Sequence, residues 1–298
     1  MSTDVRLLVA YKKSRYEQYV LDQGDQAVAH LIDEGHVSVA RLRASHRAHQ
    51  QSLETILEHL SARGIDFEAR YRGDVTDTSG FDLIIAVGGD GTVLDLSHRI
   101  DQTPMLAINS DPSASVGYFC AGFAADFPRL LDRTLTGGWE PTRLRRFYVC
   151  LNGEQVGPPV LNDVLITHAN PAAVSTYLLK VGNHPIEGQK SSGIWFSTPA
   201  GSTAAIRSAG GYVLPFRSQS FQYLVREPYP PAQGGYRFLK GLVPIHEPFE
   251  VVSRMREGRI FLDGPHLALE FGVGATLTID PDAPPLKIYG LEEDRRTA

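Results

Sequence analysis

Cysteine is scarce in this chain, which has only Cys120 and Cys150 among its 298 residues. Two thiols in a chain of this length predict reduced side chains in a cytoplasmic protein, not a disulfide framework. No apolar run reaches the about 20 residues that span a bilayer. The first residues enter an apolar run almost at once, without the core of a signal peptide. These absences favour a cytoplasmic location and exclude a membrane-embedded protein.

An excess of positive charge is also lacking. Lys and Arg total 29 against 34 Asp and Glu, which gives a net charge of −5. Nucleic-acid binders usually carry a basic surface, so no nucleic-acid partner is expected. The short basic cluster Arg143, Arg145 and Arg146 is interpreted as a solvated domain junction. A small anionic ligand remains compatible with this balance, because a few backbone N–H groups can bind one phosphate chain.

Residues at the spacing of a metal site are missing as well. The ten histidines are scattered and no Cys or His-Glu motif accompanies them, so no protein-held metal is predicted. Hydrophobic residues make up 42% and charged residues 21% of the chain, as in folded globular proteins. The length suits one large domain or two ordinary ones.

The first half alternates strand and helix patterns. Buried strands are expected at 5–11, 66–71, 83–87 and 105–109, and helices at 26–62, 92–99 and 126–135. This alternation predicts a doubly wound, Rossmann-like α/β domain over residues 1–138.

The second half is richer in short β runs, and its boundary lies near the turn Gly137–Pro141. Strands are expected at 147–151, 160–167, 177–181, 194–197, 249–253, 259–262 and 276–279, with a hairpin turn at Asn152-Gly153 between the first two. Residues 139–298 are therefore predicted to form a mainly β domain, and its last ~20 residues are expected to pack back on the first domain. Residues 215–245 receive no assignment.

The most informative segment is the glycine-rich loop Gly88-Gly89-Asp90-Gly91-Thr92. It follows a buried strand and precedes a helix, and ligands of open α/β sheets bind beyond the carboxyl ends of the strands. Glycines let the backbone approach a ligand, and the helix N-terminus offers N–H groups to an anion. The carboxylate of Asp90 would repel phosphate, so it indicates a sugar hydroxyl or a bound Mg²⁺. The alternative is a turn that merely closes a strand-to-helix connection.

Two further polar segments follow in the second half. Asn162-Asp163 opens a β run with groups that suit sugar hydroxyls or a carboxamide, although the pair is also a common turn. The stretch 198–204 (TPAGSTA) places hydroxyls and small residues before a short helical run. Its plain alternative is an ordinary helix cap. It is not a Walker A loop, because no Lys follows Gly201.

Together these segments resemble the NAD kinase family, whose members carry Gly-Gly-Asp-Gly-Thr, an Asn-Glu pair and a Thr-Pro-Thr-Gly-Ser-Thr-Ala-Tyr stretch. The glycine loop alone also resembles diacylglycerol kinases, sphingosine kinases and phosphofructokinases. The resemblance implies a phosphofructokinase-like α/β domain plus a β domain, and transfer of the γ-phosphoryl group of ATP to the 2′-hydroxyl of the adenosine ribose of NAD. It also implies partners NAD and Mg²⁺-bound ATP, and a homodimer or homotetramer.

The resemblance also implies roles for single residues. Asp90 would be catalytic, and Gly88, Gly89, Gly91 and Thr92 would serve the phosphates. Dinucleotide binding would fall to Asn162, Asp163, Thr198, Ser202, Thr203 and Ala204.

Three departures from the family pattern concern the dinucleotide pocket. Asp163 stands for the usual Glu, Ala205 for an aromatic, and Ser192 for an Asp, the last of these suggesting a mitochondrial-type branch. A lipid kinase and a nucleotide-binding regulator without turnover are the competing hypotheses. The residues decide neither NAD against NADH nor ATP against polyphosphate.

Overall fold

The computed structural model describes residues 5–231 and 233–292. Within these, the chain divides into two compact units, one built from residues 5–142 and 287–292 and the other from residues 143–286. The sequence places the boundary near 138–139, a few residues earlier, beside the glycines that follow a helix. Each unit has its own hydrophobic core.

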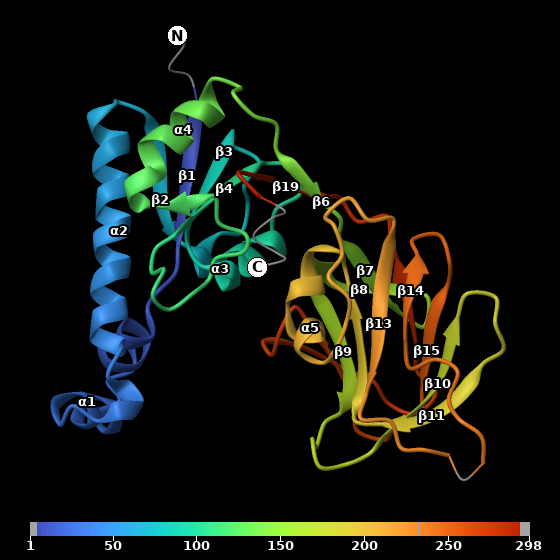
Figure 1. Cartoon of the computed structure of the whole chain (residues 1–298). Coiled ribbons are helices and arrows are strands. Elements are labelled where there is room, and N and C mark those ends of the chain that lie inside the picture. The colour runs from blue at the N-terminus through green and yellow to red at the C-terminus, as the bar shows by residue number, and fades with distance from the viewer. Residues whose placement is uncertain (1–4, 232, 293–298) are drawn as a thin grey trace. The chain divides into compact units, whose positions relative to one another are not determined.

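The first unit is built on a mostly parallel sheet (Figure 1). Its strand order is β2-β1-β3-β4-β19-β6, with β5 paired to β4. The order reverses beside β1, which is the mark of a doubly wound sheet. The strands of this sheet are β1 (Arg6–Tyr11), β2 (Asp66–Tyr71), β3 (Leu83–Gly88), β4 (Met105–Asn109), β5 (Gly122–Phe123), β6 (Thr142–Leu144) and β19 (Leu286–Tyr289). The unit boundaries at 142–143 and 286–287 fall within β6 and β19.

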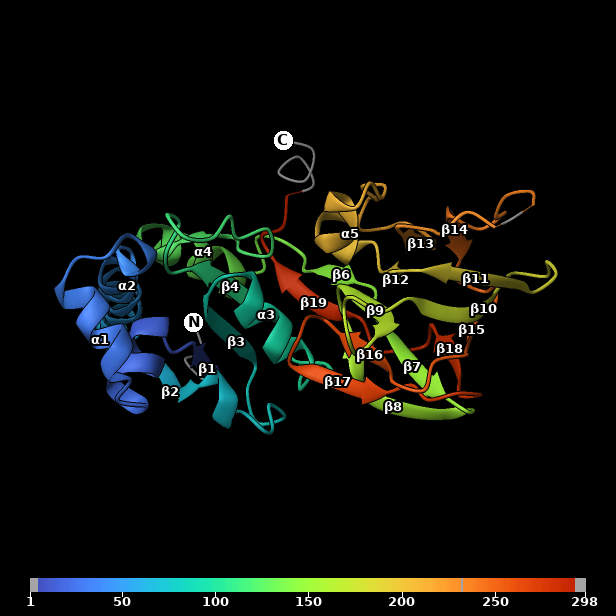
Figure 2. The same cartoon turned by 90° about the horizontal axis from the view of Figure 1, so that it is seen from below.

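Helices cover both faces of this sheet. Helices α2 (Leu42–Ala62) and α4 (Phe127–Leu135) share one core with alternate residues of β1, β3 and β4. Helix α3 (Asp90–Ser97) lies on the other side (Figure 2). Every residue of β3 is buried, as expected of a central parallel strand. The predicted α/β class is confirmed.

The prediction of a single helix at 26–62 is wrong. Residues 26–62 form α1 (Gln26–Asp33), a 3₁₀ turn (Val37–Val39) and α2, because Gly35 adopts a φ of 69° that ends the first helix. Helix α3 also starts two residues before the predicted Thr92. Smaller elements that the periodicity missed are a π-helical turn (Glu17–Asp22) and 3₁₀ turns at Arg72–Asp74 and Ala124–Asp126.

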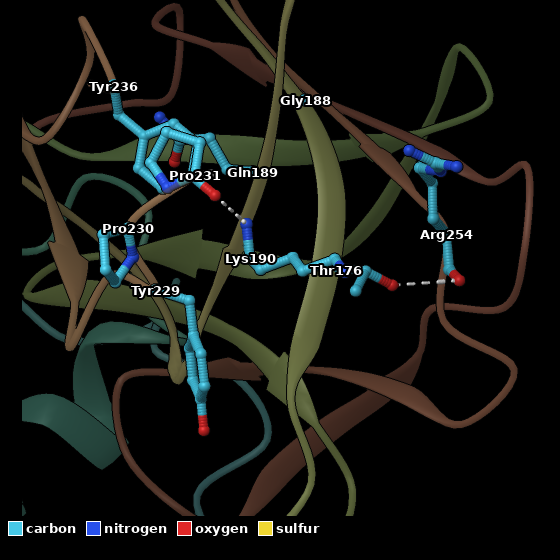
Figure 3. Close-up of a pocket in the computed structure, with 9 residues that line it drawn as sticks. All are labelled: Thr176, Gly188, Gln189, Lys190, Tyr229, Pro230, Pro231, Tyr236 and Arg254. Carbon is cyan, nitrogen blue, oxygen red and sulfur yellow. Dashed lines mark hydrogen bonds between the residues drawn. The ribbon is translucent and has the colours of Figure 1, made fainter. Parts of the chain in front are cut away.

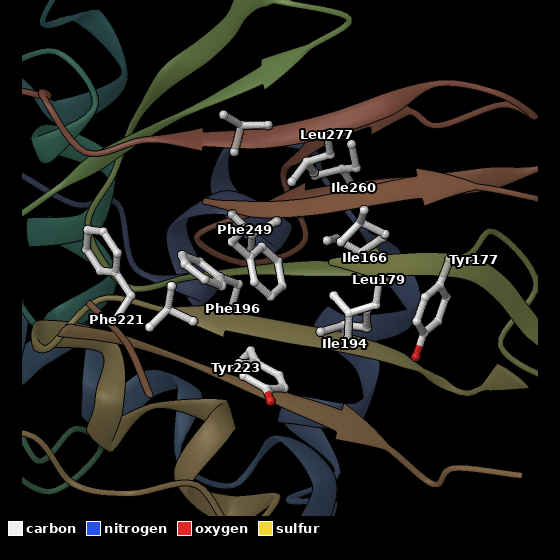
Figure 4. Close-up of a cluster of buried hydrophobic side chains, with 14 of the residues drawn as sticks. Ile166, Tyr177, Leu179, Ile194, Phe196, Phe221, Tyr223, Phe249, Ile260 and Leu277 are labelled. Atoms are coloured by element: carbon white, nitrogen blue, oxygen red, sulfur yellow. The ribbon is translucent and has the colours of Figure 1, made fainter. Parts of the chain in front are cut away.

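The second unit is a sandwich of two six-stranded antiparallel sheets, as the mainly β prediction required. The first has the order β11-β10-β15-β18-β7-β8 and the second β14-β13-β12-β9-β16-β17. Aromatic and branched side chains of both sheets interlock between them (Figure 4).

The strands of the first sheet are β7 (Phe147–Leu151), β8 (Glu154–Val160), β10 (Ser175–Val181), β11 (Glu187–Ser191), β15 (Phe249–Ser253) and β18 (Thr276–Asp280). Those of the second are β9 (Asp163–His168), β12 (Gly193–Ser197), β13 (Ser220–Arg226), β14 (Lys240–Pro244), β16 (Gly258–Leu262) and β17 (Leu267–Glu270). A 3₁₀ turn (Ala200–Thr203) and the short α5 (Ala205–Ser208) follow β12.

The predicted strand 160–167 corresponds to β9, and Val160 is the last residue of β8, a strand that was not predicted. The turn Asn152-Gly153, with φ values of 53° and 86°, joins β7 to β8, and the chain then breaks at residues 161–162 before β9. The unassigned segment 215–245 contains β13 and β14.

Two expectations about single side chains have different outcomes. Arg146 is fully buried and its Nε donates to the Pro284 carbonyl at 2.6 Å, so it is not part of a solvated junction. Cys120 and Cys150 are both free thiols.

Within the described part of the chain, no helix is long and apolar enough to cross a membrane.

Candidate functional site

The glycine loop lies at the carboxyl end of β3, the central strand of the first unit. A Cβ at Gly88 would come within 2.1 Å of Thr92 Oγ1, and one at Gly89 within 2.6 Å of Ser115 Oγ. Neither glycine has a positive φ. The loop therefore needs these glycines for close packing and not for backbone conformation. Gly91, by contrast, has open space where a Cβ would stand.

Asp90 is the first residue of α3. Its Oδ1 accepts a hydrogen bond from the Phe119 backbone N–H at 2.8 Å, and its side chain stays partly exposed. Burial raises the pKa of the Asp90 carboxyl, while the N–H groups of residues 117–119 partly offset this. The carboxylate is thus held in one orientation and is a stronger proton acceptor than an ordinary Asp.

Thr92 is buried, and the Arg72 side chain links it to Gly91 and Asp95. Arg72 Nη1 donates to the Gly91 carbonyl at 2.9 Å and to Thr92 Oγ1 at 3.3 Å, and Arg72 Nε lies 3.4 Å from Asp95. Arg72 therefore fixes the first turn of α3 and places a positive charge beside the loop. Arg72 is not among the predicted site residues, although its place directly after a predicted strand of an α/β sheet was a usable signal.

A second turn at this edge follows β4. Asn109 Nδ2 donates to the Ser115 carbonyl at 2.9 Å, and Asn109 Oδ1 accepts from the Asp111 N–H at 3.1 Å. Gly117 has a φ of 70°, and a Cβ at this position would lie 2.7 Å from Asn109 Nδ2, so the chain passes close to the Asn109 side chain here. This turn carries residues 117–119, whose N–H groups face Asp90.

In the second unit, the backbone of Asn162 and Asp163 is held by the carboxylate of Asp263. Asp263 Oδ1 accepts from the N–H groups of Asn162 at 2.6 Å and Asp163 at 3.0 Å, and its Oδ2 accepts from that of Leu161 at 2.8 Å. The buried Asn162 Oδ1 has no hydrogen-bond partner among the described residues. Such an acceptor costs about 1–3 kcal/mol unless a donor reaches it.

The 198–204 turn packs directly on this strand start. Thr198 donates through Oγ1 to the Leu161 carbonyl and through N–H to the Asn162 carbonyl, the latter at 2.9 Å. Ser202 Oγ donates to the Pro199 carbonyl at 2.7 Å. Both hydroxyls are fully buried, so they hold the turn together. Thr203 and Ala204 are more open. The structure thus brings residues 162–163 and 198–204 into one cluster within the second unit.

Asp163 is buried, and its position alters its chemistry. Burial raises the pKa of Asp163 to about 7, and the neighbouring Asp263 carboxylate adds to the effect. Near neutral pH a large share of Asp163 is therefore protonated. It can then donate a hydrogen bond as well as accept one.

This raised pKa predicts a stability change with pH. The folded state binds the Asp163 proton more tightly than the unfolded chain does, and this proton binding stabilises the folded state. The contribution is complete below the ordinary Asp pKa of about 3.9 and is lost as pH rises through about 7. Asp163→Asn removes the titration. We expect the variant to be more stable than wild type at pH 8, by at most about 4 kcal/mol, with the difference shrinking toward pH 4. Thermal unfolding at a series of pH values measures this, and a pH-independent difference would contradict it.

A pocket of about 560 Å³ elsewhere in the second unit contains none of the predicted site residues. It lies at the sheet edge formed by β11, where Tyr229, Tyr236 and two prolines lie on one side of Lys190, and Arg254 lies on the other side, beyond Thr176 (Figure 3). Tyr229 N–H and Tyr236 Oη bind the backbone of Lys190 and so cover this edge strand.

Known proteins share this fold and these segments. The N-terminal domain of ATP-NAD kinases matches residues 12–138, and the C-terminal domain matches residues 161–222. A probable NADH kinase of Oryza sativa is 38% identical over 264 residues, covering 81% of this chain and 81% of the relative. An NADH kinase of Arabidopsis thaliana is 33% identical, covering 82% of this chain and 84% of the relative.

Solved structures agree with the fold. An NAD kinase from Archaeoglobus fulgidus in complex with ATP has a TM-score of 0.70 at 20% identity, covering 98% of this chain and 96% of its own. A yeast NADH kinase complexed with NADH has a TM-score of 0.67 at 14% identity, covering 98% and 85%.

The fold and the glycine loop define a phosphotransferase. The chain belongs to the ATP-NAD kinase family.

Proposed function

We propose that this enzyme transfers the γ-phosphoryl group of ATP to the 2′-hydroxyl of the adenosine ribose of NAD or NADH. The observation that carries the proposal is the oriented, partly exposed carboxylate of Asp90 at the start of α3. The names of the plant relatives, which are NADH kinases, support the reduced dinucleotide as a substrate.

In this mechanism Asp90 accepts a proton. The 2′-oxygen attacks the γ-phosphorus, the bond from the γ-phosphorus to the β–γ bridging oxygen breaks, and ADP leaves with that oxygen. The 2′-hydroxyl proton passes to the Asp90 carboxylate and then to water. Phosphoryl transfer depends mainly on positioning and charge neutralisation, with proton transfer late. The raised pKa of Asp90 suits that acceptance.

The second unit would bind the dinucleotide. Asn162 Oδ1 is a buried acceptor that a ligand N–H or O–H could reach, and Asp163 can donate or accept. Thr203 and Ala204 would line the ligand directly. Thr198 and Ser202 would act by holding the turn, since their hydroxyls are occupied within the protein.

Mg²⁺ would enter with ATP. Among the described residues no group of three or more Asp, Glu, His or Cys side chains is arranged to hold a metal. The Asp111 carboxylate is occupied by Ser45 and Ser113. The ion would therefore be held mainly by the phosphate oxygens of ATP. When bound, Mg²⁺ would neutralise charge on the phosphate chain.

Incubation of the purified protein with Mg²⁺-ATP and either dinucleotide tests the proposal. We expect NADP from NAD or NADPH from NADH, detected enzymatically with an NADP-specific dehydrogenase, and a ratio of kcat/KM values that identifies the preferred substrate. Tight dinucleotide binding without product would instead support a regulator. Phosphorylation of a lipid with no NADP(H) formed would support a lipid kinase.

A further inference from the structure

Lys12 occupies the same edge of the first unit as the glycine loop. It directly follows β1, and its N–H donates to the Val87 carbonyl of β3 at 3.3 Å. The register pairs Tyr11 with Val87 on one side and with Tyr71 on the other. One residue further along, Lys12 is therefore level with Arg72 and Gly88, about 5 Å from each along the sheet.

Lys12 also lies on the α3 face of the sheet. Leu7 and Val9 belong to the core beneath α2 and α4, so the alternation along the strand places Leu8, Ala10 and then Lys12 on the opposite face. Helix α3 begins on this face, at Asp90. The ends of the neighbouring strands β2, β1 and β3 thus present an arginine, a lysine and the glycine loop in that order.

The Lys12 ammonium is half-buried and has no hydrogen-bond or ion-pair partner within residues 5–231 and 233–292. The next residue differs. Lys13 Nζ lies 2.8 Å from Asp22 Oδ2 and over the Tyr71 ring at 5.3 Å from its centroid. The two adjacent lysines are therefore in opposite situations, one paired within the protein and one not.

The charges around Lys12 do not neutralise it. Burial lowers the pKa of its ammonium, Asp111 counteracts this, Arg72 lowers the pKa further, and Cys120 and Arg15 have smaller opposing effects. The Asp111 carboxylate is shared between Ser45 and Ser113. His49 binds the Lys12 carbonyl at 2.7 Å, and burial lowers the pKa of His49 to about 4, so it is uncharged at neutral pH.

A half-buried cation without a partner is unfavourable unless an anion completes it. Lys12 lies at the sheet edge where the proposed reaction takes place. At the same edge, Arg72 is already bound to the Gly91 carbonyl and to Asp95. We infer that the Lys12 ammonium binds the phosphate chain of the donor and neutralises charge on the phosphoryl group as it transfers. This inference rests on the proposed function. It places the phosphate chain of ATP beside Asp90, on the side toward the end of β1.

The test compares Lys12→Met with Lys13→Met, a matched loss of one positive charge at neighbouring positions. We expect Lys12→Met to lower kcat/KM for ATP by about 100- to 1,000-fold, as loss of one transition-state contact does. The KM for the dinucleotide should change less than threefold, and Lys13→Met should stay within about threefold of wild type in both constants. Calorimetric binding of inorganic tripolyphosphate should weaken in the Lys12 variant alone.

Two further readouts separate phosphate binding from a structural role. Lys12→Met should unfold at the same temperature as wild type or higher, because it removes a poorly solvated charge. Lys12→Arg should restore part of the activity and move the alkaline decline of kcat/KM for ATP to higher pH, since guanidinium keeps its proton.

If wild type forms NADP(H) and Lys12→Met matches Lys13→Met in kcat/KM for ATP and in tripolyphosphate binding, the inference is wrong. If wild type forms no NADP(H), the proposed function fails instead. Tripolyphosphate binding that still depends on Lys12 would then support the phosphate site by itself.

Discussion

Asp90→Asn is expected to lower kcat by about 100- to 10,000-fold, the range for loss of a positioned general base. The amide cannot accept the 2′-hydroxyl proton, but its oxygen can still accept the Phe119 N–H that holds the side chain. The side chain is partly exposed at the first position of α3. The fold and the dissociation constant of the dinucleotide should therefore change little.

Asp132→Asn is a suitable control for this variant. Asp132 lies on α4 with its side chain 58% exposed, and its ion pair with Arg63 is on the surface, where such pairs contribute little. Initial rates with saturating ATP and dinucleotide give kcat for both variants, and calorimetry gives binding. An Asp90→Asn enzyme that turns over within threefold of the control would contradict the role given to Asp90.

Gly201→Ala is expected to have the largest effect on stability. A Cβ at residue 201 would lie 2.0 Å from the Asn162 carbonyl oxygen and 2.5 Å from its Cα. Backbone atoms cannot rotate away as a side chain can, so the 198–204 turn must move off β9. We expect a loss of about 3 kcal/mol or more, at or beyond the upper end for overpacking, together with weaker dinucleotide binding.

Gly272→Ala is the matched control in the same unit, because a Cβ there meets nothing within 4 Å and the residue has no positive φ. Denaturant unfolding of both variants gives the two free energies. Equal unfolding free energies would mean that the turn is not packed on Asn162 as described.

The sequence predicted most strands of the first unit because their apolar runs are short and bounded. The predicted bounds of β2 and β4 agree with the structure. The helix at 26–62 was wrong because the apolar period continues through Gly35, whose left-handed φ ends the helix. Strand β8 was not predicted because Gly157, Pro158 and Pro159 interrupt its apolar pattern.

The candidate site was predictable where a motif concentrates chemistry in adjacent residues, as in the glycine loop. The physical need for Gly88 could not be predicted, because it depends on the Thr92 side chain folding back over it. The clamp that Asp263 forms on the 161–163 backbone joins residues about 100 positions apart. Lys12 and Arg72 each follow a predicted strand, but only the strand order places both of them beside the loop.

A crystal structure with bound NAD or NADH tests the central claim most directly. It should place the 2′-oxygen of the adenosine ribose within hydrogen-bonding distance of the Asp90 carboxylate, about 2.6–3.2 Å. A dinucleotide bound elsewhere, with the Asp90 carboxylate still turned only toward the backbone of residues 117–119, would contradict the account.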